Sequence, residues 1–207
     1  MEKSQQQVLQ DLADAERRDG WLPACEAAGR FFHVTVELAD ALAEVLRGLS
    51  EGPILEICAG RGELAAALRR RGCPVVATDA ALHDGAGVIR LDAREALRRY
   101  RPTLVLGCFV PTGEQIDQAV LAQPEVRDYV ILNARLGPTC GDSDLWNMDG
   151  WHARPLGRVA ERLVTRHDVW LGNGHEILRR GEAWHLQKVG NPASDRSRQF
   201  CLANNDH

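Results

Sequence analysis

Short apolar runs alternate with amphipathic stretches in the middle of the chain. The runs are bounded by Gly, Pro or charged residues, as in buried strands, and the stretches between them carry Leu and Ala at helical spacing. The pattern predicts strands at residues 53–58, 73–79, 87–91, 102–110 and 129–134, and helices at 62–72, 92–100 and 112–122. Because strands that alternate with helices form parallel sheets covered on both faces, we expect an α/β protein with a doubly wound sheet.

The first 50 residues have a different pattern. Residues 1–20 read as a polar helix that is either loosely held or packed on the surface, and residues 21–32 place aromatic side chains among small ones. Large apolar residues at Leu38, Leu42, Val45, Leu46 and Leu49 keep helical spacing and predict one buried stripe. We expect residues 1–50 to form a helical cap over the carboxyl edge of the sheet.

After Ala134 the alternation stops. Residues 135–154 read as a long loop, which a compact domain rarely carries without a function. A helix at 155–163 and antiparallel strands at 164–171, 176–180 and 183–189 are expected to close the sheet. Residues 51–190 then form one catalytic domain, and residues 191–207 a polar tail.

Composition narrows the class of protein. With 25 Lys and Arg against 29 Asp and Glu, the net charge of −4 argues against a strongly basic nucleic-acid binder. The apolar runs are too short to span a membrane, and the polar N-terminus lacks the apolar stretch of a signal peptide. The six cysteines form no CxxC pair, so we expect reduced thiols in the cytoplasm and no metal site. The oligomeric state stays open, with a homodimer as one alternative.

A glycine loop is the most informative motif. The segment from Glu56 through Gly60 to Gly62 ends the first predicted strand and opens a helix. The glycines permit tight turns, and the helix N-terminus presents free N–H groups to a polar ligand. Asp79 ends the second strand, where a carboxylate can accept both hydroxyls of a ribose. These residues predict a nucleoside-bearing cofactor at the carboxyl edge.

Two cofactors fit this loop. Gly60, Gly62 and Ala65 match the G-x-G-x-x-G/A dinucleotide pattern, so the pattern alone does not exclude NAD. The chain is too short for a separate catalytic domain, however, and neither Tyr100 nor Tyr129 has a lysine four residues later, as a short-chain reductase needs. The third strand also ends at Asp92, which suits recognition of an adenine amine.

Together Glu56, the Gly60/Gly62 loop, Asp79 and Asp92 resemble the class I S-adenosylmethionine-dependent methyltransferases. The resemblance covers residues 31–190, and FFHVTVELADALAEVL and ILEICAGRGELAAAL are similar to small bacterial members of specialised-metabolite pathways. It implies a seven-stranded Rossmann-like fold with an antiparallel C-terminal strand or hairpin. In that family the loop contacts the methionine part, the second-strand acid the ribose and the third-strand acid the adenine. The implied cofactor site is Glu56, Cys58, Ala59, Gly60, Arg61, Gly62, Asp79, Asp92, Ala93 and Cys108.

The chain departs from the family pattern at two places. Cys58 stands where the first glycine of the loop is usual, which narrows the space beside the ligand. Gly107-Cys-Phe-Val-Pro111 replaces the Asn-Pro-Pro-Tyr of base methylators, so we do not expect nucleic-acid bases as substrates. The expected reaction is methyl transfer to a small molecule. Cyclisation or rearrangement with the same cofactor, and a non-catalytic regulatory protein that binds S-adenosylmethionine, are the alternatives.

Acceptor residues are predicted from residue type alone. Aromatic side chains are expected to line the acceptor pocket: Trp21, Phe32, Phe109, Trp146 and Trp151, with Phe31 and Met148 near them. His33 and His152 are the expected general bases, because a histidine titrates near pH 7. The loop at 135–154 is expected to act as a lid.

Each of these residues also has a purely structural interpretation. The aromatic residues can be a satellite core under loops, and a lone histidine is usually a surface or packing residue. Asp79 can simply end a strand, and Asp92 with Glu95 has the spacing of a capping box. Thr112 and Gln115 form a second predicted capping box, with no chemistry assigned to it.

Overall fold

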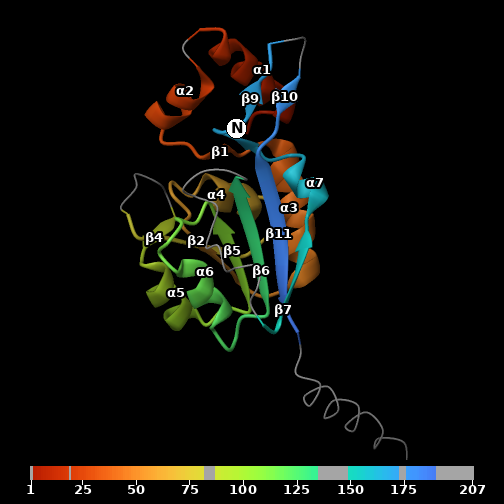
Figure 1. Ribbon diagram of the computed structural model, residues 1–207. Coiled ribbons are helices and arrows are strands. Elements are labelled where there is room, and N and C mark those ends of the chain that lie inside the picture. Colours follow the sequence, from red (N-terminus) through yellow and green to blue (C-terminus); the bar gives the residue numbers. More distant parts are fainter. Residues whose placement is uncertain (1, 19, 82–86, 135–148, 173–175, 190–207) are drawn as a thin grey trace, which may run out of the picture.

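A seven-stranded sheet forms the centre of the computed structural model, which describes residues 2–18, 20–81, 87–134, 149–172 and 176–189 (Figure 1). The strand order is β4–β3–β2–β5–β6–β11–β7. In that order the strands are Val88–Arg90, Val75–Asp79, Ile54–Ile57, Leu104–Cys108, Asp128–Ala134, Gly181–Lys188 and Trp151–Pro155. Neighbours from β4 to β6 are parallel, and β11 is antiparallel to both β6 and β7. The predicted mostly parallel sheet with an antiparallel C-terminal strand is confirmed.

Helices cover both faces of this sheet. On one face lie α3 (Val36–Leu49), α4 (Glu63–Arg69) and α7 (Gly157–Ala160), and on the other α5 (Ala93–Tyr100) and α6 (Ile116–Leu121). Successive strand residues point to opposite faces, so Leu104 and Leu106 join the core under α3 and α4, whereas Val105 joins the core under α5 and α6. The doubly wound arrangement is therefore confirmed.

The C-terminal region differs from the prediction in two ways. Residues 151–155, predicted as loop, form the edge strand β7. The predicted strands at 164–171 and 176–180 do not join the central sheet: β8 (Val164–Thr165) pairs with β1 (Phe32–His33), and β9 (Val169–Trp170) pairs with β10 (Ile177–Leu178). The reason is the buried carboxylate of Asp168, which accepts from the backbone N–H groups of Thr165 and Arg180 and turns the chain between the short strands.

The N-terminal segment is anchored rather than loosely held. Helix α1 (Gln5–Glu16) begins with a capping box between Ser4 and Gln7, and α2 is Trp21–Ala27. Leu12 is fully buried in a small core with Trp21 and Val164, so of the two alternatives predicted for residues 1–20 the loosely held helix was wrong, and the helix packs on the rest of the protein. Figure 1 shows α1 and α2, together with β9 and β10, above the carboxyl ends of β5 and β6.

Two predicted helix starts have different outcomes. Asp92 caps α5, where its Oδ1 accepts from the backbone N–H of Arg94 at 2.9 Å. The Thr112–Gln115 capping box does not form, because Gln115 has φ of 54° and α6 begins only at Ile116. Among the described residues, no helix is long and apolar enough to cross a membrane.

Candidate functional site

A cavity of about 800 Å³ opens at the carboxyl edge of the sheet. The ends of β2, β3 and β5 form its floor, and the segment from Glu26 to Val34 forms its wall on the side of the cap. Nine of the ten residues expected at a cofactor line this cavity: Glu56, Cys58, Ala59, Gly60, Arg61, Asp79, Asp92, Ala93 and Cys108. The tenth, Gly62, is the N-cap of α4 directly behind the loop.

The loop after β2 adopts a backbone that favours glycine. Cys58, Gly60 and Gly62 have φ of 55°, 54° and 75°, so Cys58 holds a left-handed conformation although it carries a Cβ. A Cβ on Gly62 would lie 2.4 Å from Cγ2 of Val88, whereas a Cβ on Gly60 would meet nothing within 4 Å. Gly62 is therefore required by packing, and the space beside Gly60 is open.

Asp79 connects this loop to the end of β3. Its Oδ2 accepts from the N–H of Gly60 at 2.8 Å, and its Oδ1 accepts from the N–H of Ala81 at 2.8 Å. Both oxygens thus hold backbone in place while the residue lines the cavity. Asp92 likewise combines a helix cap with a place in the lining, so the structural and the ligand-binding interpretations are compatible at both acids.

Glu56 is the most buried acid of the site. Its side chain is 1% exposed, lines the cavity, and has an Oε2 without a hydrogen-bond partner. Burial raises its pKa from 4.5 to about 8, so the carboxyl is protonated at neutral pH. Burial also raises the pKa of the Cys58 thiol to about 12 and that of Cys108 well above its usual value. Both thiols are neutral and therefore weak nucleophiles.

An aromatic cluster lies at the junction of the cavity and the cap. The rings of Phe32 and Phe109 stack with centroids 5.1 Å apart, and Phe31 lies 5.9 Å from Phe109. All three line the cavity, and the Arg166 guanidinium covers Phe31. Phe109 has φ of 52°, a strained conformation held by this packing. The structure thus brings two of the predicted acceptor residues, Phe32 and Phe109, into the cavity lined by the residues predicted to bind the cofactor.

Trp21 and His33 line a different cavity of about 540 Å³ between the cap and α4. The Trp21 indole stacks on His33 with centroids 4.8 Å apart and donates through Nε1 to the carbonyl of Thr165. Nε2 of His33 lies 3.7 Å from Sγ of Cys25. Burial lowers the pKa of His33 to about 4, which makes it a weak base. Both cavities are lined by Ala28, Arg30, Val34 and Glu63, so the two adjoin.

Trp151 and His152 lie at the far edge of the sheet. In the antiparallel pairing of β7 with β11, Trp151 is opposite Lys188 and His152 is opposite Gln187. On the other side of β11, Gln187 is opposite Asp128, the first residue of β6. Because β6 runs parallel to β5, its first residue marks the amino edge, opposite the cavity. The structure therefore does not bring these two predicted acceptor residues to the cavity at the carboxyl edge. Trp146, Met148 and most of the predicted lid lie outside the described residues.

Several lining residues were not predicted from the sequence. Leu91, Pro111, Glu114 and Ile116 follow strand ends, so the rule that placed Asp79 and Asp92 can also find them. The segment from Glu26 to Arg30 carried no local signal, because its place at the cavity depends on tertiary contacts such as the pairing of the adjoining β1 with β8.

Comparison with known proteins gives remote likenesses only. No family model matches the chain, and no curated protein matches it. A 1,6-didemethyltoxoflavin-N1-methyltransferase from Burkholderia thailandensis is 13% identical, with 88% of each chain covered and a TM-score of 0.48. A SAM-dependent methyltransferase from Bacteroides fragilis with bound S-adenosyl-L-homocysteine is 13% identical, over 74% of this chain and 77% of that one, with a TM-score of 0.43.

An rRNA methylase from Streptococcus thermophilus is 12% identical, over 73% of this chain and 94% of that one, with a TM-score of 0.42. These three solved structures are methyltransferases, at identities and TM-scores too low to assign a family to this chain. The functional assignment therefore depends on the geometry of the site.

Proposed function

We propose that the protein binds S-adenosylmethionine in the cavity of about 800 Å³ and transfers its methyl group to a small molecule. One observation carries the proposal: a glycine loop, a strand-end acid and a helix-capping acid line a single cavity at the carboxyl edge of a doubly wound sheet. This edge is where such folds bind nucleotides.

The lining fits the chemistry of this cofactor. The open space beside Gly60 admits a ligand against the backbone, and Glu56 offers a buried polar atom that lacks a partner. Asp79 would hold the ribose hydroxyls and Asp92 the adenine amine. The bound cofactor supplies an activated methyl group on a sulfonium, so the protein's work is alignment rather than activation.

The acceptor is proposed to lie on the cluster of Phe31, Phe32 and Phe109. This apolar surface adjoins the cofactor residues within the same cavity, whose volume is in the range of small-molecule sites. Base catalysis by His33 or His152 is not part of the proposal, since the first is a weak base in the adjoining cavity and the second lies at the opposite edge.

A thermal-shift experiment tests the cofactor. S-adenosylhomocysteine at 100 times its Kd should stabilise the protein by about 2.7 kcal/mol, which raises Tm by roughly 5–10 °C for a chain of this size. NADH at the same concentration should leave Tm unchanged. Stabilisation by NADH alone would replace the proposal with a dinucleotide-binding function.

Asp79→Asn tests the ribose contact. The amide oxygen can still accept from Gly60 N–H, whereas a charged acceptor for the ribose is lost. We expect the affinity for S-adenosylhomocysteine to fall by about 1.5–3 kcal/mol, measured by calorimetry. The Tm of the ligand-free protein should fall as well, because the amide NH2 group of Asn cannot accept from the N–H of Ala81. An unchanged affinity would leave Asp79 with its role in the backbone turn alone.

A further inference from the structure

The short strand β1 and the residues beside it separate the two cavities. Phe31 and Phe32 line only the cavity of about 800 Å³, whereas His33 lines only the adjoining cavity of about 540 Å³. Successive residues of a strand point to opposite sides, so β1 presents an aromatic surface to one cavity and an imidazole to the other. The two cavities adjoin at Arg30 and Glu63, which line both.

The larger cavity has to hold two molecules if the proposed reaction takes place there. Its volume of about 800 Å³ is in the range of a site for one small ligand, and the cofactor and the reacting part of the acceptor would share it. The second cavity adds about 540 Å³, which is also in that range. An acceptor that carries a further group can therefore extend across the junction.

The junction carries only a weak ionic contact. Nη2 of Arg30 lies 4.0 Å from Oε1 of Glu63, and both side chains are about half exposed. An exposed ion pair of this kind contributes little to stability, so the two side chains can shift at small cost when a ligand lies between them.

The charges that line the second cavity cancel in pairs. The six charged residues of its described lining form three ion pairs: Lys3 with Asp11, Arg70 with Glu2, and Arg30 with Glu63. His33 adds no charge, because burial lowers its pKa to about 4. A charged ligand group would lose hydration there without meeting an excess of opposite charge. An uncharged apolar group gains instead by leaving water against side chains such as Val8, Ala15 and Ala24.

We propose that the cavity of about 540 Å³ binds an uncharged, largely apolar group of the methyl acceptor, and that the acceptor is an elongated molecule whose two ends occupy the two cavities. This inference depends on the proposed function, since it concerns the acceptor of the same reaction. It names a class of acceptor that is longer than the aromatic cluster alone can hold.

The first experiment locates the uncharged group. Naphthalene-2-methanol is titrated into the full chain saturated with S-adenosylhomocysteine, and binding is followed by ligand-observed NMR. Ala24 lines only the second cavity, so Ala24→Phe should weaken binding of the probe at least about tenfold by filling that space. Leu22→Phe, on the same helix but outside both linings, should leave the affinity unchanged. Equal affinities for wild type and Ala24→Phe would overturn the inference.

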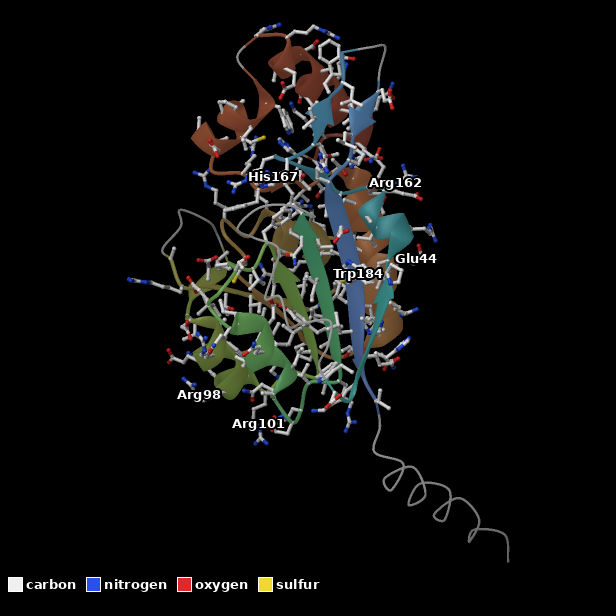
Figure 2. The ribbon with its side chains drawn as sticks, in the orientation of Figure 1. Glu44, Arg98, Arg101, Arg162, His167 and Trp184 are labelled. Carbon is white, nitrogen blue, oxygen red and sulfur yellow. The ribbon has the colours of Figure 1, made fainter. Side chains whose placement is uncertain are left out.

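The second experiment tests the charge of the group. Naphthalene-2-carboxylate and 2-naphthylmethylammonium should bind at least about fivefold more weakly than the alcohol. Asp11→Asn leaves Lys3 without its partner, so it should tighten binding of the carboxylate roughly two- to fivefold. Asp14→Asn on the same helix, and Glu44→Gln on α3 (Figure 2), remove a charge outside both linings and should have no such effect. Tighter binding of either ion than of the alcohol to wild type would contradict the uncharged class.

A longer probe tests whether one molecule spans both cavities. The chain of 6-(2-naphthyl)hexan-1-ol should reach the aromatic cluster, so Phe31→Ala should weaken its binding about threefold or more and leave naphthalene-2-methanol unaffected. The same response of both probes to Phe31→Ala would overturn the elongated acceptor while the proposed function stands. If the wild-type protein binds no S-adenosylhomocysteine, the proposed function fails and this inference fails with it.

Discussion

Between pH 5 and pH 8 the ligand-free wild-type protein should lose on the order of 4 kcal/mol of stability that the Glu56→Gln variant keeps. Burial raises the pKa of Glu56 from 4.5 to about 8 in the folded protein. Within this window the folded chain holds a proton that the unfolded chain releases. The contribution of the protonated Glu56 to the free energy of unfolding is therefore complete below pH 4.5, and it is lost as the pH rises towards and through the pKa of about 8 that Glu56 has in the folded protein.

Urea unfolding at pH 5 and pH 8 measures the effect. All other groups titrate in both proteins, so the difference between wild type and variant isolates Glu56. Glu44→Gln is the matched control, because the Glu44 side chain is 62% exposed and should leave the pH dependence unchanged. Parallel pH profiles for wild type and Glu56→Gln would mean that Glu56 is ionised in the folded state.

Gly62→Ala should destabilise the protein by about 3 kcal/mol, and Gly72→Ala by only about 1 kcal/mol. The two glycines have similar φ, 75° and 79°, so both substitutions carry the same backbone strain. A Cβ at position 62 would lie 2.4 Å from Cγ2 of Val88, however, whereas a Cβ at position 72 would meet nothing within 4 Å. The difference between the two losses of unfolding free energy measures the cost of the contact between the new Cβ at position 62, the N-cap of α4, and Val88 of β4.

A double-mutant cycle checks this interpretation. Val88→Ala removes the methyl group that the new Cβ meets, so it should recover part of the loss in Gly62→Ala but none of the loss in Gly72→Ala. Equal losses in the two single variants would show that Val88 moves aside without cost and that Gly62 is required only for its φ.

The central layers of the fold, and the edge of the sheet that carries Asp79 and Asp92, could be predicted from the sequence alone. Strands β2 to β6 and their helices follow from hydrophobic periodicity, because each is decided by which side chains it can bury against its neighbours. Asp79 and Asp92 reach one cavity for a related reason: the carboxyl ends of parallel strands meet at one edge, so a residue's position along its own strand is enough to place it.

The acceptor side depended on the tertiary structure. Trp151 was predicted to line a pocket because it is a large aromatic residue. It lies at the amino edge instead, because the antiparallel register of β7 with β11 pairs it with Lys188. His33 is a weak base because the cap buries it against Trp21 and Cys25. Phe32 reaches Phe109 through the pairing of β1 with β8, more than 100 residues later in the chain. Residue type and local spacing carry no information about such pairings, since their register is set by contacts between distant segments.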